Sequence, residues 1–331
     1  MRTRVLSFVV ALALLSASAV LVGQRAMTLG SIAPANSLWD RALKQMATDV
    51  QAATERRVRI RVASMTQGDE SAIVRRLLLG TTQVASLTLI GLSELDESFD
   101  VLGMPFFFSS DAEARHVLGA LEPRFVRGLE AQNLVLINWG HTGWAHLFSA
   151  ERISSLAELR DAKLFTSAGD DRVVRWFREN GFNPVPLSLS DVPVGLNTGL
   201  INAYPFPPYA ALLLQYYRPA PHMLDLPLGP VLGATVMHKR HWYRLSPEDR
   251  EAIMTAGQEL ENGLFKNVPV QDTEAVEEMK TRGLEVTELS AAELTAFRTA
   301  ADEMNASMRG TIVAADVFDE AIQARDAFRA Q

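Results

Sequence analysis

Cysteine is absent from the 331 residues of this chain. Disulfides, thiolate metal sites and cysteine nucleophiles are therefore excluded. The chain also lacks the short signatures of serine hydrolases, zinc proteases, dinucleotide-binding folds and phosphate-binding loops, because no G-x-S-x-G, H-E-x-x-H, G-x-G-x-x-G or P-loop stretch occurs. Beyond the N-terminus, no run approaches the ~20 apolar residues that cross a bilayer. These absences favour binding over catalysis.

An excess of positive charge is lacking as well, since the formal net charge is −7. The chain therefore offers no general affinity for nucleic acid or anionic lipid. Residues 57–62, R-V-R-I-R-V, alternate strictly and predict a strand with its three arginines outward. A nucleic-acid patch is the less favoured alternative for this stretch, because no aromatic residues interleave with the arginines.

Candidates for a metal site or a catalytic pair are few. His238 and His241 are three residues apart, but no acid lies near them in the sequence, which is poor for binding a cation. Asp170 and Asp171 could form a catalytic pair, although adjacent carboxylates at a helix start more often complement the helix dipole. The sequence predicts no catalytic residue, no metal ligand and no cofactor.

The N-terminus carries an export signal. Arg2 and Arg4 precede an apolar run at residues 5–15, and Ala17 and Ala19 form an A-x-A cleavage site. We therefore expect residues 1–26 to be a signal peptide, with an uncleaved membrane anchor as the alternative. Both interpretations place the body of the protein outside the cytoplasmic membrane, in the periplasm.

The remaining chain is typical of an α/β protein of about two domains, given its length. Two short helices are expected at residues 111–120 and 123–131, and a buried strand at residues 134–139. Gly140 and Gly143 then flank a turn that suits a hinge between domains.

One long helix is expected at residues 247–280. Ser246 can cap it, Pro247 suits its first position, and Gly283 follows its end. Pro269 interrupts the helix, so a kink near Asn267 is expected. At 1.5 Å per residue the helix reaches ~50 Å, long enough to lie across two domains.

Residues 196–209, L-N-T-G-L-I-N-A-Y-P-F-P-P-Y, predict a rigid aromatic corner. Gly199 ends a helix and a short strand follows. Proline lacks the N–H that a central strand needs, so the backbone leaves the sheet and exposes Tyr204, Phe206 and Tyr209. The corner is either a pocket wall, outside the carboxyl end of a strand, or a buried turn that packs its own aromatics.

Other aromatic residues leave the same choice open. Trp39 lies in the first turn of a predicted helix, where it can line a pocket or join the core. Three consecutive phenylalanines at residues 106–108 are either a core plug or a pocket wall.

Four segments in order resemble the solute-binding proteins of tripartite ATP-independent periplasmic (TRAP) transporters, the dicarboxylate-type family. They are residues 153–163, 183–186, 196–203 and 239–249. The resemblance implies two α/β lobes joined by crossing strands, with the long helix at 247–280 bridging them. It implies lobe I at 27–140 plus about 232–265, and lobe II at 141–231 plus about 280–331. It also implies a ligand in a cleft that closes like a hinge, and a permease of one small and one large membrane subunit as partner.

Two positions depart from the family's pattern. Acid-binding members usually carry an arginine two residues after a lysine of the strand, and the matching position here is Phe165. A ligand-binding asparagine of the family corresponds to Phe206. Because a buried carboxylate without a cation is costly, the ligand is expected to be apolar or amphipathic and not a small dicarboxylate. Arg172 could instead rescue acid binding.

The expected ligand-binding residues share aromatic or rigid apolar character. They are Phe165, Phe206, Trp144, Tyr204, Trp39 and Pro207. The leading hypothesis is an exported solute receptor for a TRAP permease. One alternative is a periplasmic carrier or scaffold that serves a partner protein, and another is a periplasmic hydrolase.

Overall fold

A computed structural model describes residues 25–168 and 171–331. The prediction of a signal or anchor at residues 1–26 lies outside this range except for its last two positions, and Asp170 of the adjacent acidic pair also lies outside it. No helix within the described residues is both long and apolar enough to cross a membrane.

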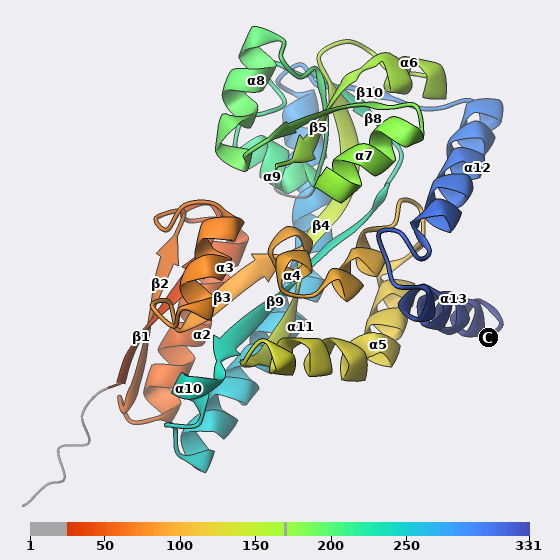
Figure 1. The fold of residues 1–331 in the computed structure, drawn as a ribbon. Helices are drawn as coiled ribbons and strands as arrows, with labels where there is room; N and C mark the ends of the chain where they lie inside the picture. Colours follow the sequence, from red (N-terminus) through yellow and green to blue (C-terminus); the bar gives the residue numbers. More distant parts are fainter. Residues whose placement is uncertain (1–24, 169–170) are drawn as a thin grey trace, which may run out of the picture.

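The molecule is built on two sheets that share one strand (Figure 1). In the first sheet, three parallel strands meet the long antiparallel strands β9 and β4, in the order β2-β1-β3-β9-β4. In the second, β4 pairs with β7 and β8, β5 lies between β7 and β6, and β10 pairs with β8. The strands of the first sheet are β1 (Arg25–Ser31), β2 (Val58–Ser64), β3 (Val84–Thr88), β9 (Gly229–His238) and β4 (Leu134–Ser149), and those of the second are β5 (Lys163–Ser167), β6 (Asn183–Leu187), β7 (Ala203–Phe206), β8 (His222–Leu224) and β10 (Glu285–Thr287).

The two sheets and their helices form the two lobes of an α/β periplasmic-binding-protein-like fold, which confirms the predicted fold class. We keep the names lobe I for the group around the first sheet and lobe II for the group around the second; their residue limits stay predictions. The helices around lobe I are α2 (Leu38–Ala53), α3 (Glu70–Leu78), α4 (Leu89–Leu95), the 3-10 helix η1 (Glu97–Gly103), α5 (Asp111–Ala131) and α10 (Lys239–Trp242). Those around lobe II are α6 (Leu156–Asp161), α7 (Asp171–Glu179), η2 (Leu189–Asp191), α8 (Val192–Thr198) and α9 (Pro208–Leu213).

The expected turn at residues 140–144 is wrong, because β4 continues through it from lobe I into lobe II. The strand accommodates its glycines by irregular pairing with β9, with register shifts between Leu136 and Asn138 and between His141 and Trp144. Gly143 has a φ of 119°, which L side chains rarely adopt, and a Cβ added there would overlap the side chains of Asp272 and Pro207. The glycines therefore mark a bulge in a crossing strand.

The expected pair of helices near Pro123 is also wrong, since α5 runs unbroken from Asp111 to Ala131. Val117, Leu121, Phe125 and Leu129 recur every fourth residue across the proline, and all are fully buried. This continuous apolar face outweighs the one backbone hydrogen bond that a proline removes.

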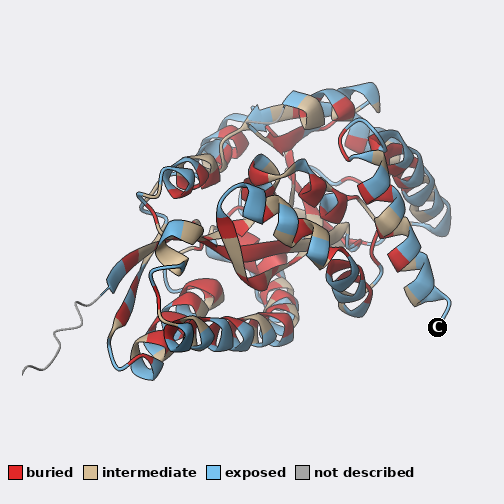
Figure 2. Ribbon diagram, turned by 60° about the horizontal axis from the view of Figure 1, so that its bottom comes forward, coloured by how far each residue is buried: buried red, intermediate tan, exposed pale blue. Residues whose placement is uncertain are grey.

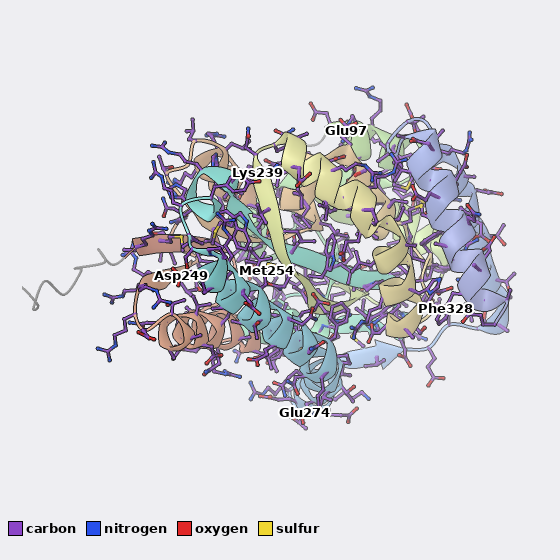
Figure 3. All side chains as sticks on the ribbon, turned by 90° about the horizontal axis from the view of Figure 1, so that it is seen from below. Glu97, Lys239, Asp249, Met254, Glu274 and Phe328 are labelled. Atoms are coloured by element: carbon purple, nitrogen blue, oxygen red, sulfur yellow. The ribbon has the colours of Figure 1, made fainter. Side chains whose placement is uncertain are left out.

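The long helix α11 (Pro247–Lys280) has the predicted bounds and contains Pro269. Ser246 caps it by accepting a hydrogen bond from the backbone N–H of Asp249 at 3.2 Å. The helix packs against α2 of lobe I, against β4, and against α9 of lobe II. Figure 3 shows it crossing the molecule between Asp249 and Glu274.

The C-terminal helices α12 (Ala291–Met308) and α13 (Ala315–Arg329) cover one side of the molecule (Figure 1). α13 packs on α5, where Arg124 contacts Asp316 at 2.7 Å and Glu320 at 3.0 Å. Buried positions line the inner faces of the helices and both sheets (Figure 2). Phe107 and Phe108 are buried against each other, so this part of the triple phenylalanine is core.

Candidate functional site

Three of the expected ligand residues share one aromatic cluster in lobe II. Tyr204 and Phe206 lie on the same face of β7, because successive strand residues alternate between faces. Phe165 of β5 belongs to the same apolar cluster. Tyr204 stacks on Phe148 at 5.3 Å and meets Phe206 edge-on at 5.9 Å. The predicted exit from the sheet and the exposure of the tyrosines are wrong, because Pro205 lies within β7, opposite Leu147 of β4, and Tyr204 and Tyr209 are buried. Phe165 is also buried, whereas Phe206 is half-buried.

The Tyr204 hydroxyl is buried without a hydrogen-bond partner among the described residues. Burial holds the pKa of Tyr204 well above its usual value, so the side chain stays a neutral phenol. A buried polar group without a partner costs free energy. The indole Nε1 of the buried Trp39 is in the same condition.

Trp39 and Tyr209 bring the two lobes into contact. Their rings lie 5.1 Å apart between centroids, and Trp39 belongs to α2 whereas Tyr209 belongs to α9. The Tyr209 hydroxyl oxygen accepts a hydrogen bond from the backbone N–H of Leu38 at 3.1 Å. Leu38 is the first residue of α2, where backbone N–H groups have no partner within the helix.

Trp144 and Pro207 lie at the crossing region instead. The Trp144 ring packs against a different apolar cluster from that of Phe165, and its indole N–H donates to Asp111 Oδ1 at 2.7 Å. Pro207 is buried at the start of α9, and its Cβ would lie 2.7 Å from a methyl group added at Gly143. These two residues are close in space to the bulge of β4.

Asp272 of α11 is a functional candidate that our sequence interpretation missed. Its carboxylate accepts hydrogen bonds from the backbone N–H groups of Tyr209 at 3.0 Å and Trp144 at 3.2 Å. Burial raises the pKa of Asp272 to about 6, although the two N–H groups and His141 oppose the rise. Its spacing in the sequence could have revealed it, because Asp272 follows the buried residues Leu264 and Val268 at intervals of four on the same helix face.

Beside this carboxylate, Asp111 pairs with His141 Nε2 at 3.1 Å. Burial opposes ionisation of Asp111, but hydrogen bonds from His141 and Trp144 prevail and lower its pKa. His141 is fully buried against Phe265, and its Nδ1 has no hydrogen-bond partner among the described residues. No hydroxyl nucleophile is therefore aligned with this pair in the described part of the chain.

A cavity of about 600 Å³ lies between α4 and η1 of lobe I and α7 of lobe II. Arg172 lines it and pairs with Glu97 at 2.8 Å and with Asp100 at 3.5 Å. Glu94 and Asp96 line the same cavity, so carboxylates outnumber the arginine. Its apolar lining comes from both lobes and includes Leu89, Ile90, Val173, Trp176, Phe177 and Ile312.

A second cavity, of about 670 Å³, lies in lobe I beside α2 and the end of β2. Asp40, Lys44, Arg61 and Arg76 line it, and Asp40 is buried and bound to Lys44 at 2.7 Å. The six expected ligand residues line neither of these two cavities. The described residues include no group of three side chains that could hold a metal ion.

Comparison with known proteins adds a family and a fold. The family model of bacterial extracellular solute-binding proteins, family 7, matches residues 29–310. A solute-binding protein of Chromohalobacter salexigens is 25% identical over 227 residues, which cover 66% of each chain. The 2,3-diketo-L-gulonate-binding periplasmic protein YiaO of Escherichia coli is 25% identical over 226 residues, which cover 67% of this chain and 68% of YiaO.

Among solved structures, the chain is similar to DctP7 of Bordetella pertussis, an extracytoplasmic solute receptor binding pyroglutamic acid. The TM-score is 0.83 at 20% sequence identity, and the match covers 91% of this chain and 99% of DctP7. At this identity the likeness concerns the fold, and it agrees with the two-lobed arrangement described above.

Proposed function

Because the chain belongs to the bacterial extracellular solute-binding proteins of family 7, a family of receptors and not of enzymes, we propose that it captures a small organic solute between its lobes and delivers it to the two membrane subunits of a TRAP-type permease. The family supports a periplasmic location for the body of the protein. The signal peptide predicted at residues 1–26 agrees with this location.

The solute that we propose is amphipathic, with an apolar body and one polar end. The observation that carries this proposal is the aromatic face of lobe II, made of Phe165, Tyr204 and Phe206. Two of these residues stand where the resemblance leads us to expect an arginine and an asparagine. A phenyl ring provides apolar contact and no charge for a carboxylate. The unpaired Tyr204 hydroxyl and Trp39 indole N–H can serve the polar end.

The surroundings of Arg172 support the same choice. This arginine was the alternative grip for an acid, but Glu97 and Asp100 already contact its guanidinium. A solute carboxylate would have to compete with these carboxylates, and like charges repel across the cavity. The known ligands of relatives are acids, namely 2,3-diketo-L-gulonate for YiaO and pyroglutamic acid for DctP7, so acids are the competing class in the test.

The test is a titration of the purified protein, followed by tryptophan fluorescence. 1-Octanol and 2-phenylethanol, which are uncharged, represent amphipathic solutes, and D-glucuronate and succinate represent sugar acids and small dicarboxylates. We expect the amphipathic pair to bind at least 100-fold more tightly, which corresponds to about 2.7 kcal/mol. Tighter binding of D-glucuronate or succinate would contradict the proposed solute class and leave the receptor function intact.

Delivery to a permease is tested separately. Deletion of a permease gene next to the gene for this chain should abolish uptake of the solute. Uptake that persists, together with a periplasmic protein captured by the loaded receptor, would favour the carrier alternative.

A further inference from the structure

Asp272 places a buried carboxylate on the inner face of the bridging helix α11, where its neighbours on that face are apolar. It lies one helical turn after Val268 and is followed by Ala275 and Met279, which are all buried. Figure 3 labels Glu274, two residues further along the same helix, where the side chain is exposed. A buried carboxylate is costly unless hydrogen bonds compensate for the lost water, so the contacts of Asp272 need a reason.

Each carboxylate oxygen of Asp272 serves a different segment. Oδ1 accepts the N–H of Tyr209 in the first turn of α9, and Oδ2 accepts the N–H of Trp144 on the crossing strand β4. The N-cap of α9 is Pro207, which supplies no side-chain cap, so Asp272 supplies an acceptor from another helix. A negative charge is also favourable beside the first turn of a helix.

The close approach of β4 requires glycine at position 143. A methyl group there would overlap Oδ2 of Asp272 and would lie 2.7 Å from Cβ of Pro207. Gly143 also has a φ of 119°. Three segments that are distant in the sequence, around residues 143, 207 and 272, therefore meet where the chain crosses from lobe I to lobe II.

Tyr209 extends this arrangement into lobe I. Its backbone N–H is held by Asp272, while its hydroxyl oxygen accepts the N–H of Leu38 and its ring packs on Trp39. The resulting path runs from α11 through α9 to the first residue of α2. It connects the bridging helix to the contact between the lobes, and it contains no residue of the aromatic face of lobe II.

We propose that Asp272 is a positioning residue for solute capture: it fixes the start of α9 on the crossing strand, so that Tyr209 ties lobe II to the N-terminus of α2 when the lobes close. The proposal rests on the proposed receptor function for its biological meaning. The hydrogen-bond path itself can be tested without any solute.

The solute-free test is amide hydrogen exchange in Asp272→Ala and Tyr209→Phe, with Glu274→Gln as the control that removes an exposed charge from the same helix. The Leu38 amide is compared with the Val50 amide in the last turn of α2. We expect the Leu38 amide to exchange at least tenfold faster in both variants and at the wild-type rate in the control. The exchange rate of the Val50 amide should stay the same in all of them. In the double variant, the Leu38 amide should exchange no faster than in Tyr209→Phe alone, because the two residues act in one path.

A purely structural role predicts a different result. It would accelerate exchange of the Leu38 and Val50 amides together, whereas the positioning role accelerates Leu38 alone. The urea midpoint of Asp272→Ala falls in either case, because the N–H groups of Tyr209 and Trp144 lose their acceptor. An unchanged Leu38 amide in Asp272→Ala would overturn the proposal. Circular dichroism checks that each variant folds. If Asp272→Ala does not fold, Tyr209→Phe, which removes only a hydroxyl, still tests the path.

Binding of 1-octanol and 2-phenylethanol then separates the two proposals. A tenfold loss of affinity in Asp272→Ala and in Tyr209→Phe supports the positioning role in capture. Equal affinity in all variants would contradict that role. If Leu38 responds as expected and neither probe binds the wild-type chain, the proposed solute class is wrong while the positioning of α2 by Asp272 stands.

Discussion

Arg172 of lobe II pairs with Glu97 of lobe I at 2.8 Å, across the cavity between the lobes. Asp100 contacts the same guanidinium at 3.5 Å. The arginine that could grip an acidic solute is therefore engaged by carboxylates of the protein itself. This pairing is the physical reason for expecting weak binding of sugar acids despite an arginine in the cavity.

The first prediction concerns the double variant Glu97→Gln with Asp100→Asn. Removing two carboxylates beside Arg172 lowers the repulsion of an incoming anion, so affinity for D-glucuronate should rise about three- to tenfold, the scale of partly exposed ion pairs. Isothermal titration calorimetry at low salt measures the change. Glu274→Gln is the control, because its charge lies far along α11, and an equal gain in that variant would argue for a general charge effect.

A second prediction separates core from binding wall within the aromatic cluster. Phe148→Ala should lower the unfolding free energy by about 3–5 kcal/mol, because Phe148 is fully buried and stacks on Tyr204. Phe206→Ala should cost less stability, since its side chain is only half-buried, and should weaken 2-phenylethanol binding about tenfold or more. Urea unfolding and fluorescence titration give the two values. A Phe206→Ala chain with unchanged affinity would place Phe206 outside the solute site.

The third prediction follows from the pKa of Asp272, which burial raises to about 6 from an ordinary 3.8. The folded chain holds this proton more tightly than the unfolded chain. The stability that Asp272 contributes is thus fully present below pH ~4 and is lost as the pH rises through ~6. Relative to Asp272→Asn, the wild-type chain should lose about 2–3 kcal/mol of unfolding free energy between pH 4 and pH 7. Urea unfolding of both chains at the two pH values measures the difference, and a constant difference would show that the pKa is not raised.

A fourth prediction uses two glycines of opposite surroundings. Gly143→Ala should lower the unfolding free energy by about 2 kcal/mol or more, because of its positive φ and the overlap with Asp272 and Pro207. Gly119→Ala lies in the exposed interior of α5 with open space around it, and should raise stability by up to about 1 kcal/mol. Thermal unfolding compares the pair. Equal effects of the two substitutions would contradict the close approach at the bulge of β4.

Local signals in the sequence were sufficient for much of the fold. Ser246 and Pro247 gave the start of α11 correctly, since capping and a proline at the first helical position depend only on neighbouring residues. The glycine stop at Gly199, with its φ of 70°, was correct for the same reason. The family resemblance, drawn from short segments in order, agrees with the family match over residues 29–310.

The errors arose where distant contacts decide the local structure. Pro123 does not end α5, because buried side chains on both sides of it pack on the same core. The glycines at 140 and 143 do not make a turn, because β9 pairs with β4 on both sides of them, from Leu134 to Ala145. Asp272 was missed because its partners lie about 60 and 130 residues away, and only the apolar spacing of its helix face hinted at a buried carboxylate.

The central claim, capture of an amphipathic solute by this receptor, is tested most directly by native mass spectrometry of the chain exported by its own host and purified without denaturation. The account predicts a bound organic molecule with an apolar body and a single polar end, which Phe206→Ala releases. A sugar acid or a dicarboxylate bound to the wild-type chain would contradict it.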